Sequence, residues 1–230
     1  MTEALSPSEG EAVLHLFAKV GSRPVDRGGE DVVAAVRKAQ ADGDQVITAS
    51  LLGHKADLAV MGIGADWTRL RRLQTALEDA GLQVVDSYVS LTEVSEYAKG
   101  MPAEHLDARL HPVLPPAGKR AFCFYPMSKR RAEGHNWYTL DFEARKELMM
   151  DHGRSGRRFA GRIVQLITGS TGLDDYEWGV TLFGVHPDDL KDCVYTMRFD
   201  EASAHYAEFG RFYVGVVDEI ETVVGQVGLA

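Results

Sequence analysis

The first half of the chain alternates short apolar runs with two helical stripes of apolar residues. The apolar, β-rich runs predict strands at residues 13–20, 45–52, 57–63 and 82–91. Apolar residues at helical spacing predict one helix over residues 31–41 and a second from Asp66, a suitable N-cap, to Gly81. The resulting order, strand–helix–strand–strand–helix–strand, is the ferredoxin-like pattern.

The second half repeats this order. Strands are predicted at residues 120–125, 163–168, 176–183 and 212–217. A helix over residues 142–152 follows Asp141 as N-cap, and we expect Gly153 just past its end. Another helix begins with Pro187 in its first turn and runs to about Met197, with more helix expected up to residue 209.

Between the halves, residues 98–119 contain four of the eight prolines and break both patterns. We interpret this segment as a linker loop between residues 1–97 and residues 120–230. The expected fold class is α+β, with two ferredoxin-like (βαββαβ) domains in tandem whose antiparallel sheets form a barrel-like core.

Bulk composition is that of an ordinary globular protein, with 45% hydrophobic and 26% charged residues. The N-terminus lacks the basic and apolar regions of a signal peptide, and no apolar run has the length of a membrane span. Cys123 and Cys193 stand far apart, which favours buried thiols in a reducing cytoplasm over a disulfide scaffold. The net charge of −9 argues against nucleic-acid binding.

Charge is unevenly distributed along the chain. Residues 119–162 contain eleven Lys and Arg against five Asp and Glu, so this block carries +6 and the other 186 residues carry −15. Such a block is either a solvated basic face or a clamp for an anionic small molecule.

Three side chains in this block have either a structural or a chemical interpretation. His152 shares the apolar face of its helix with Leu148 and Met149, so it is either a packed core residue or a ligand for haem iron. Tyr125, which we expect at a strand end before Pro126, is either a core tyrosine or a redox-active phenol. Lys129 is close enough to Tyr125 to supply a cation to a substrate carboxylate.

Together these residues resemble the coproheme decarboxylases, a branch of the chlorite dismutase family. The matching segments cover the second half densely: YPMSKRR (125–131), NWY (136–138), HG (152–153), GRIVQ (161–165), ITGS (167–170), WGVTL (178–182) and MRFDEAS (197–203). The first half matches by its order of elements.

The resemblance implies a homopentamer and an enzyme of haem biosynthesis whose substrate, iron-coproporphyrin III (coproheme), is also its cofactor. Hydrogen peroxide oxidises the iron, and a tyrosyl radical removes propionates 2 and 4 as carbon dioxide to give haem b. It also implies a cytoplasmic protein that binds no membrane or nucleic acid, with transient contact to coproporphyrin ferrochelatase.

Site residues follow from the same resemblance. Tyr125 matches the radical tyrosine and His152 the proximal iron ligand. Positions that hold or flank the propionates are Arg109, Met127, Lys129 and Ser203, and His111 is the candidate base for peroxide. Gln165 stands at the distal position where chlorite dismutases have an arginine, which argues against chlorite decomposition.

Two alternatives remain open. A haem-binding carrier without catalysis would bind coproheme and haem b comparably and cause no mass loss with peroxide. A chlorite dismutase-like enzyme would evolve oxygen from chlorite.

Overall fold

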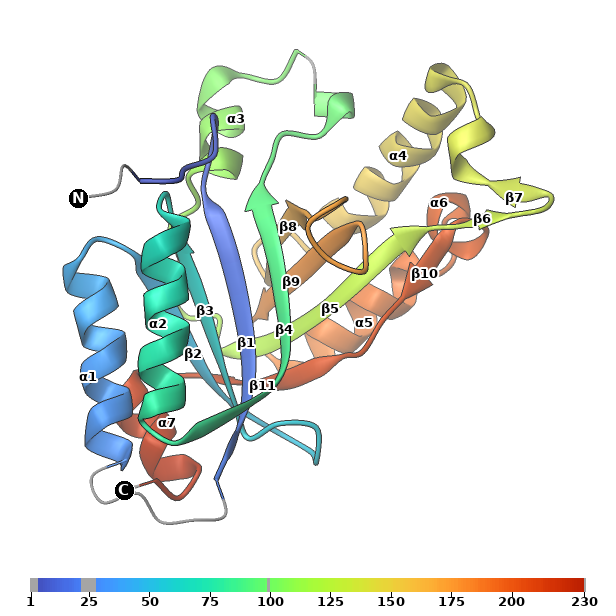
Figure 1. The fold of residues 1–230 in the computed structure, drawn as a ribbon. Coiled ribbons are helices and arrows are strands. Elements are labelled where there is room, and N and C mark those ends of the chain that lie inside the picture. Colours follow the sequence, from blue (N-terminus) through green and yellow to red (C-terminus); the bar gives the residue numbers. More distant parts are fainter. Residues whose placement is uncertain (1–3, 22–27, 99, 230) are drawn as a thin grey trace.

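The computed structural model describes residues 4–21, 28–98 and 100–229 (Figure 1). The N-terminal half contains β1 (Ala12–Val20), α1 (Gly28–Ala41), β2 (Gln45–Leu51), β3 (Leu58–Gly64), α2 (Trp67–Asp79) and β4 (Leu82–Thr92). The C-terminal half contains β5 (Ala121–Lys129), α4 (Phe142–Arg157), β8 (Ile163–Gly169), β9 (Trp178–Gly184), α5 (Pro187–Met197) and β11 (Tyr213–Val217). The other elements are η1 (Glu96–Ala98), α3 (Ala103–Leu110), β6 (Arg131–Ala132), β7 (His135–Asn136), η2 (Trp137–Thr139), α6 (Glu201–Ala204), β10 (Ala207–Phe209) and α7 (Ile220–Gln226).

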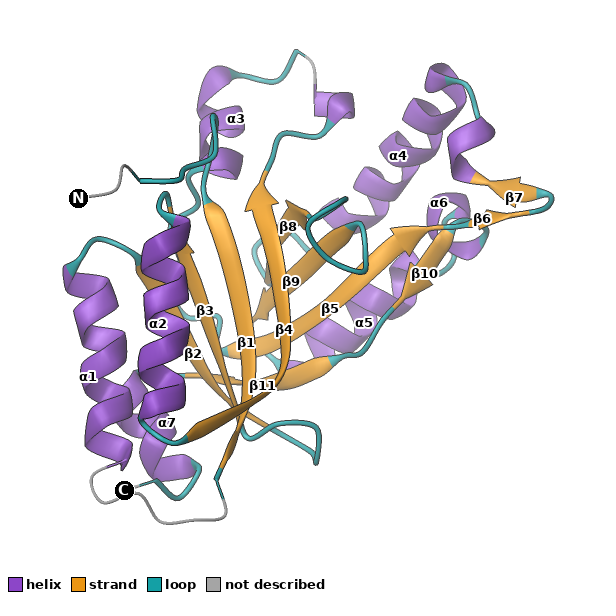
Figure 2. Ribbon diagram, in the orientation of Figure 1, coloured by secondary structure: helices purple, strands orange, loops and turns teal. Residues whose placement is uncertain are grey.

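The strands close into one antiparallel barrel. The N-terminal half has the order β2-β3-β1-β4 and the C-terminal half the order β11-β5-β9-β8, which is the ferredoxin-like order in both. Pairing of β11 with β2 and of β4 with β8 joins the two sheets at both edges, with β10 added beside β5. Helices lie outside this barrel (Figure 2). The predicted fold class is therefore confirmed.

Side-chain alternation along each strand divides the apolar residues between two cores. Phe122 and Phe124 of β5 point into the barrel, where they pack with Phe17 and Phe183. Cys123 and Tyr125, one position out of phase, belong to the outer core beneath α5. This alternation places Tyr125 outside the barrel, under the helices.

Several predicted helix boundaries are confirmed by their caps. The carboxylate of Asp66 accepts from the amide of Thr68, and that of Asp141 accepts from the amide of Ala144. Gly81, just past α2, has φ +93°, the left-handed conformation that favours glycine.

The predicted end of α4 at Gly153 is wrong, because the helix continues to Arg157. Gly153 and Gly156 do not adopt positive φ, whereas Gly161 does, with φ +82°. A glycine ends a helix through the left-handed conformation, so a glycine that keeps helical angles is compatible with continuation.

Residues 207–209 form strand β10 rather than the predicted helix. β10 pairs with residues 127–129 of β5, which supply the hydrogen-bond partners that a helix would have found within itself. β5 itself continues past the predicted end at Tyr125 to Lys129. Tyr125 therefore lies in the middle of a strand, opposite Val180, and the carbonyl of Pro126 accepts from the amide of Gly210.

The segment predicted as a linker loop, residues 98–119, begins at the last residue of η1 and contains α3, while residue 99 lies outside the described residues. The C-terminal helix α7, which was not predicted, buries Ile220 and Val223 in the outer core of the N-terminal half. Among the described helices none is long and apolar enough to cross a membrane.

Candidate functional site

A small cavity lies between the outer face of the C-terminal sheet and helices α4 and α5. Its walls come from β5 (Tyr125, Met127), α4 (His152), β8 (Gln165, Ile167), β9 (Val180), α5 (Val194, Met197) and the segment from α5 to β10 (Arg198, Ser203, Phe209). The cavity volume is about 30 Å³, close to the share of space that one water molecule occupies in the liquid. Five of the eight residues predicted from the sequence line it: Tyr125, Met127, His152, Gln165 and Ser203.

His152 is oriented by a carboxylate. Its Nδ1 lies 3.1 Å from Oδ2 and 3.2 Å from Oδ1 of Asp200, whose side chain is 5% exposed. A carboxylate only accepts hydrogen bonds, so Nδ1 carries the proton and Nε2 of the neutral ring carries the lone pair. A histidine held in this way is the usual arrangement of a metal ligand.

Asp200 is itself held in place at the N-cap of α6. It accepts from the amide of Ser203 at 3.0 Å, and the Ser203 hydroxyl lies 3.4 Å from His152 Nδ1. Burial alone would raise the pKa of Asp200, but the hydrogen bonds from His152 and Ser203 hold it below its ordinary value. The carboxylate therefore stays charged beside the imidazole.

Tyr125 is buried among aromatic rings. Its ring stacks on Phe212 with a centroid distance of 4.5 Å and lies 5.7 Å from Phe209. Burial raises its pKa, so the phenol is protonated at neutral pH. Among the described residues its hydroxyl has no hydrogen-bond partner, which leaves the O–H bond free to face a ligand in the cavity.

Lys129 lies on the same side of β5 as Tyr125 and Met127, but it does not line the cavity. Its Nζ donates to the carbonyl of Ala202 at 3.0 Å and lies 4.2 Å from the Trp137 ring centroid. Burial lowers its pKa to about 8, against the opposing effect of the nearby carboxylates of Asp200 and Glu177.

Arg109 and His111 are also outside the cavity wall. Arg109 is exposed in the last turn of α3, and His111 follows as its C-cap, with Nδ1 3.2 Å from Glu11 Oε1. The roles predicted for Arg109, His111 and Lys129 stay predictions.

Most cations of the basic block (residues 119–162) already form ion pairs within the chain. Seven of its eleven cations have a carboxylate within 4 Å: Arg120, Arg130, Arg131, Arg145, Lys146, Arg154 and Arg162. Net charge along the chain therefore overstates the number of cations available to an anionic ligand.

Two residues at the site were missed by reasoning from the sequence. Asp200 lies within the matching segment 197–203 and received no role of its own, although an Asp three residues before Ser203 is a recognisable N-cap signal. Arg198, whose guanidinium lies 3.9 Å from the Phe209 ring centroid, borders the cavity and had no distinguishing signal beyond the same segment.

Comparison with known sequences gives a consistent assignment. The sequence profile of the family described as chlorite dismutase matches residues 26–218. The coproheme decarboxylase of Staphylococcus carnosus (strain TM300) is 44% identical over 205 residues, which cover 84% of this chain and 80% of that protein.

Two solved structures share the fold. A haem-binding protein from Thermus thermophilus has a TM-score of 0.87 and 34% identity, covering 98% of this chain and 100% of that one. A mutant chlorite dismutase from Candidatus Nitrospira defluvii has a TM-score of 0.76 and 18% identity, covering 96% of this chain and 97% of that one. At 18% identity the likeness concerns the fold alone.

Proposed function

Because this chain belongs to the chlorite dismutase family, we propose that it is a hydrogen peroxide-dependent coproheme decarboxylase of haem biosynthesis. Its substrate is iron-coproporphyrin III and its product is haem b. One observation carries the proposal: His152, whose Nδ1 is bound by Asp200, and Tyr125, whose hydroxyl has no hydrogen-bond partner among the described residues, line the same apolar cavity. The 44% identical relative named coproheme decarboxylase supports it.

His152 is the residue that would hold the substrate iron, through Nε2. The negative charge of Asp200 on the other side of the ring strengthens donation from Nε2 and prevents ring rotation. Apolar walls from Ile167, Val180 and Val194 suit the face of a porphyrin and exclude water around it.

The iron of the bound substrate, oxidised by hydrogen peroxide, supplies the oxidising equivalents. Tyr125 loses an electron and its phenolic proton, and the resulting tyrosyl radical takes a hydrogen atom from the β-carbon of propionate 2 or 4. The phenol is thereby restored. Loss of a second electron from the propionate releases carbon dioxide and leaves a vinyl group, so each decarboxylation yields two electrons, which one peroxide molecule takes up.

The remaining predicted residues hold the substrate in place or transfer a proton. Met127, Gln165 and Ser203 line the cavity. We assign Met127 and Ser203 to flanking the propionates and Gln165 to the distal side of the porphyrin. Lys129 and Arg109 bind propionate carboxylates, and His111 accepts a proton from peroxide. None of these last three residues lines the cavity, so their roles require direct contacts with bound substrate.

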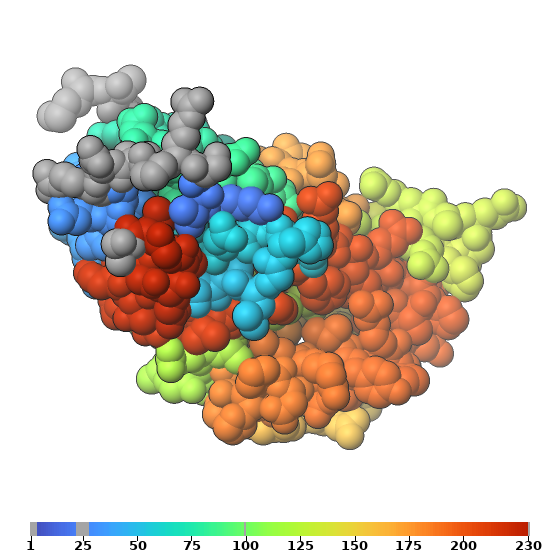
Figure 3. Space-filling view, turned by 90° about the horizontal axis from the view of Figure 1, so that it is seen from below, coloured from blue at the N-terminus to red at the C-terminus, as the bar shows by residue number. Residues whose placement is uncertain are grey.

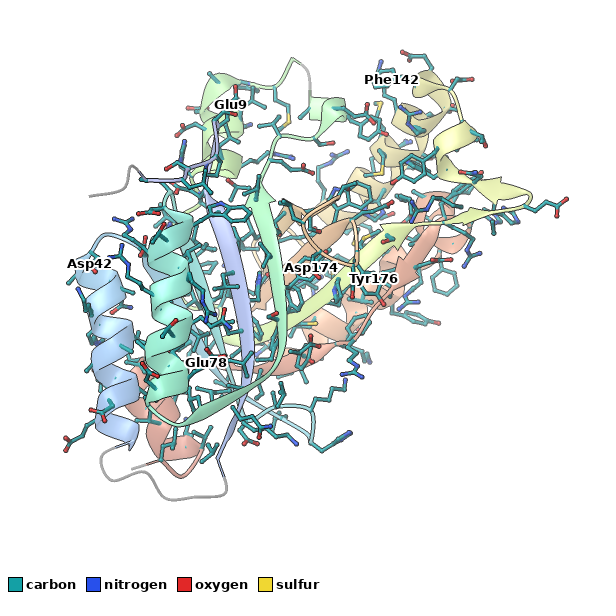
Figure 4. All side chains as sticks on the ribbon, in the orientation of Figure 1. Glu9, Asp42, Glu78, Phe142, Asp174 and Tyr176 are labelled. Atoms are coloured by element: carbon teal, nitrogen blue, oxygen red, sulfur yellow. The ribbon has the colours of Figure 1, made fainter. Side chains whose placement is uncertain are left out.

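α4 forms the wall of the cavity opposite the sheet and packs against α5 and α6. Its outer end, at Phe142, projects away from the barrel in Figure 4.

We also propose that the protein is a cytoplasmic homopentamer that contacts coproporphyrin ferrochelatase transiently to receive its substrate. The resemblance of residues 125–203 to the coproheme decarboxylases supports this part of the proposal. Light scattering tests the stoichiometry against the chain mass of 25.3 kDa.

One experiment separates the candidate functions. The protein is mixed with iron-coproporphyrin III, peroxide is titrated, and the porphyrin mass is followed. Loss of two carbon dioxide molecules per substrate supports the decarboxylase. An unchanged mass with comparable affinity for coproheme and haem b would identify a carrier. Oxygen evolution from chlorite at a substantial rate would identify a chlorite dismutase, against which Gln165 argues.

His152→Ala tests the iron ligand independently. The variant should bind iron-coproporphyrin more weakly and with an altered absorption spectrum. An unchanged spectrum would remove His152 as the ligand.

A further inference from the structure

A buried pair of sulfur atoms lies beside the His152 cavity. Met197 ends α5 and lines the cavity, and Cys193 stands one turn before it on the same face of the helix. The Cys193 thiol donates to Sδ of Met197 at 3.8 Å. In the space-filling view from below (Figure 3), α5 (orange) lies at the surface of the molecule, and these two side chains are on its buried side, 3% and 8% exposed.

Met197 belongs to the part of the cavity wall that the helices form. Its methyl carbon lies 3.8 Å from the position that a Cβ on Gly156 of α4 would take, and Gly156 is one turn after His152. Met197 also packs with Phe159. The thiol of Cys193 takes up one lone pair of Sδ, so the thioether is held in one orientation with its second lone pair available. The sulfur therefore has a fixed place near the residue that would hold the substrate iron.

The thioether of Met197 is open to oxidation by the peroxide that the proposed function brings to this cavity. Hydrogen peroxide transfers one oxygen atom to the sulfur: an S–O bond forms, the O–O bond breaks, and the products are a sulfoxide and water. The sulfur loses two electrons and the peroxide gains two, so the reaction needs no further reactant.

The neighbouring thiols are protected by their protonation. Burial raises the pKa of Cys193 to about 11 and that of Cys123 to about 12. Peroxide oxidises the thiolate form of cysteine, which is scarce at both positions at neutral pH. A thioether reacts without losing a proton, so Met197 is the member of the pair that is oxidised.

The methionines of this chain differ in what they face. Met150 on α4 is 59% exposed and meets dissolved peroxide directly, whereas Met197 is reached through the cavity. Met61, 1% exposed in the barrel interior, faces neither solvent nor the cavity. Oxidation that starts in the cavity should therefore modify these methionines in a different order from oxidation that starts in solvent.

We propose that Met197 is an oxidation site that switches off porphyrin binding: peroxide that reacts at a bound iron porphyrin with no propionate left to oxidise converts Met197 to its sulfoxide. The sulfoxide adds a polar oxygen to an apolar wall, so porphyrin binds more weakly and is released. Excess peroxide thereby stops the loading of the site. The inference rests on the proposed function for its porphyrin and its peroxide.

The oxidation site is tested with haem b, which lacks propionates 2 and 4. The protein is loaded with haem b and treated with peroxide, and its peptides are analysed by mass spectrometry. Met197 should gain the mass of one oxygen atom before Met150 does, and Met61 should stay unmodified. Without porphyrin, Met150 should be oxidised first. The proposal is overturned if Met150 is oxidised first in both samples, or if Met127 is oxidised and Met197 is not.

Met197→Leu tests the consequence for binding, with Met127→Leu on the sheet wall of the same cavity as the matched control. After peroxide treatment with haem b and removal of the haem, the wild type and Met127→Leu should bind iron-free coproporphyrin about tenfold more weakly than before. Met197→Leu should keep the affinity that it had before treatment. An equal loss in Met197→Leu, or no loss in a wild type whose Met197 is oxidised, would contradict the switch.

Leucine and methionine have similar volumes, so both variants should fold, which circular dichroism checks. The peptide analysis uses only the wild type and decides the oxidation site whether or not the variants fold. Peptide mass reports on Met197 and porphyrin mass reports on decarboxylation. The switch can therefore fail while decarboxylation stands, and the reverse also holds.

Discussion

The imidazole of His152 and the carboxylate of Asp200 lie 3.1 Å apart, and this contact joins α4 to the N-cap of α6. Forty-eight residues separate the two in the chain. The hydrogen bond gives Nε2 its free lone pair and its direction, which are what a metal-binding histidine requires.

Asp200→Asn keeps the size of the side chain but removes its charge. We expect affinity for iron-coproporphyrin to fall about 10- to 100-fold, the usual effect of losing such an outer partner. Affinity for iron-free coproporphyrin should stay the same, because no ligand bond is involved. Fluorescence and absorption titrations measure the two affinities, and an equal loss for both porphyrins would assign Asp200 a purely structural role.

Tyr125→Phe removes a hydroxyl that no described residue hydrogen-bonds. Since no hydrogen bond is lost, the free energy of unfolding should change by about 1 kcal/mol or less, and coproheme binding should be retained. Production of haem b should fall about a hundredfold or more, the scale on which a positioned hydrogen-transferring side chain acts. Mass spectrometry of the porphyrin after peroxide addition provides the measurement. Wild-type production by the variant would refute the radical role.

His15 in the barrel interior should make stability depend on pH. Its Nε2 contacts the hydroxyl of Thr181 at 2.9 Å, and burial lowers its pKa to about 3. Between pH 6.5 and 3 the unfolded chain binds a proton that the folded chain does not, so stability falls as pH falls. Urea unfolding should show a loss from this group of about 2–3 kcal/mol between about pH 6.5 and 4.5.

His15→Gln should flatten that pH dependence, since glutamine cannot titrate. His54→Gln, at an exposed position in the β2–β3 connection, is the matched control and should keep the wild-type slope. Equal slopes for the wild type and His15→Gln would contradict the assignment.

The pairing of β11 with β2, which joins the two halves of the barrel, depends on Gly215 of β11. A Cβ at this position would overlap the carbonyl oxygen of Ser50 in β2, so alanine forces the two strands apart. We expect Gly215→Ala to lower the free energy of unfolding by about 1–3 kcal/mol.

Gly225→Ala is the control for that substitution, because a Cβ there meets no atom within 4 Å and the residue lies inside α7. Alanine should raise the free energy of unfolding by about 0.5–1 kcal/mol. Denaturant unfolding of both variants measures the two effects. Similar effects at the two positions would contradict the close approach of Gly215 to the backbone of Ser50.

Local sequence patterns predicted the structure correctly where neighbouring residues determine it. The caps Asp66 and Asp141 and the start of α5 at Pro187 depend on a few adjacent residues, and all three are confirmed. Predictions failed where distant segments compete for the backbone. β10 is a strand because β5 offers it partners, and β5 itself extends past Pro126 because β9 and β10 pair with it.

The sequence by itself determined the two repeats of strands and helices, because apolar runs and helical spacing are local properties. It also marked His152 and Tyr125 as residues worth testing, and the family resemblance assigned their roles. Only the tertiary structure decided that Asp200 meets His152 and that the two sheets close into one barrel. These two features arise from contacts between segments far apart in the chain, which no local pattern of residues encodes.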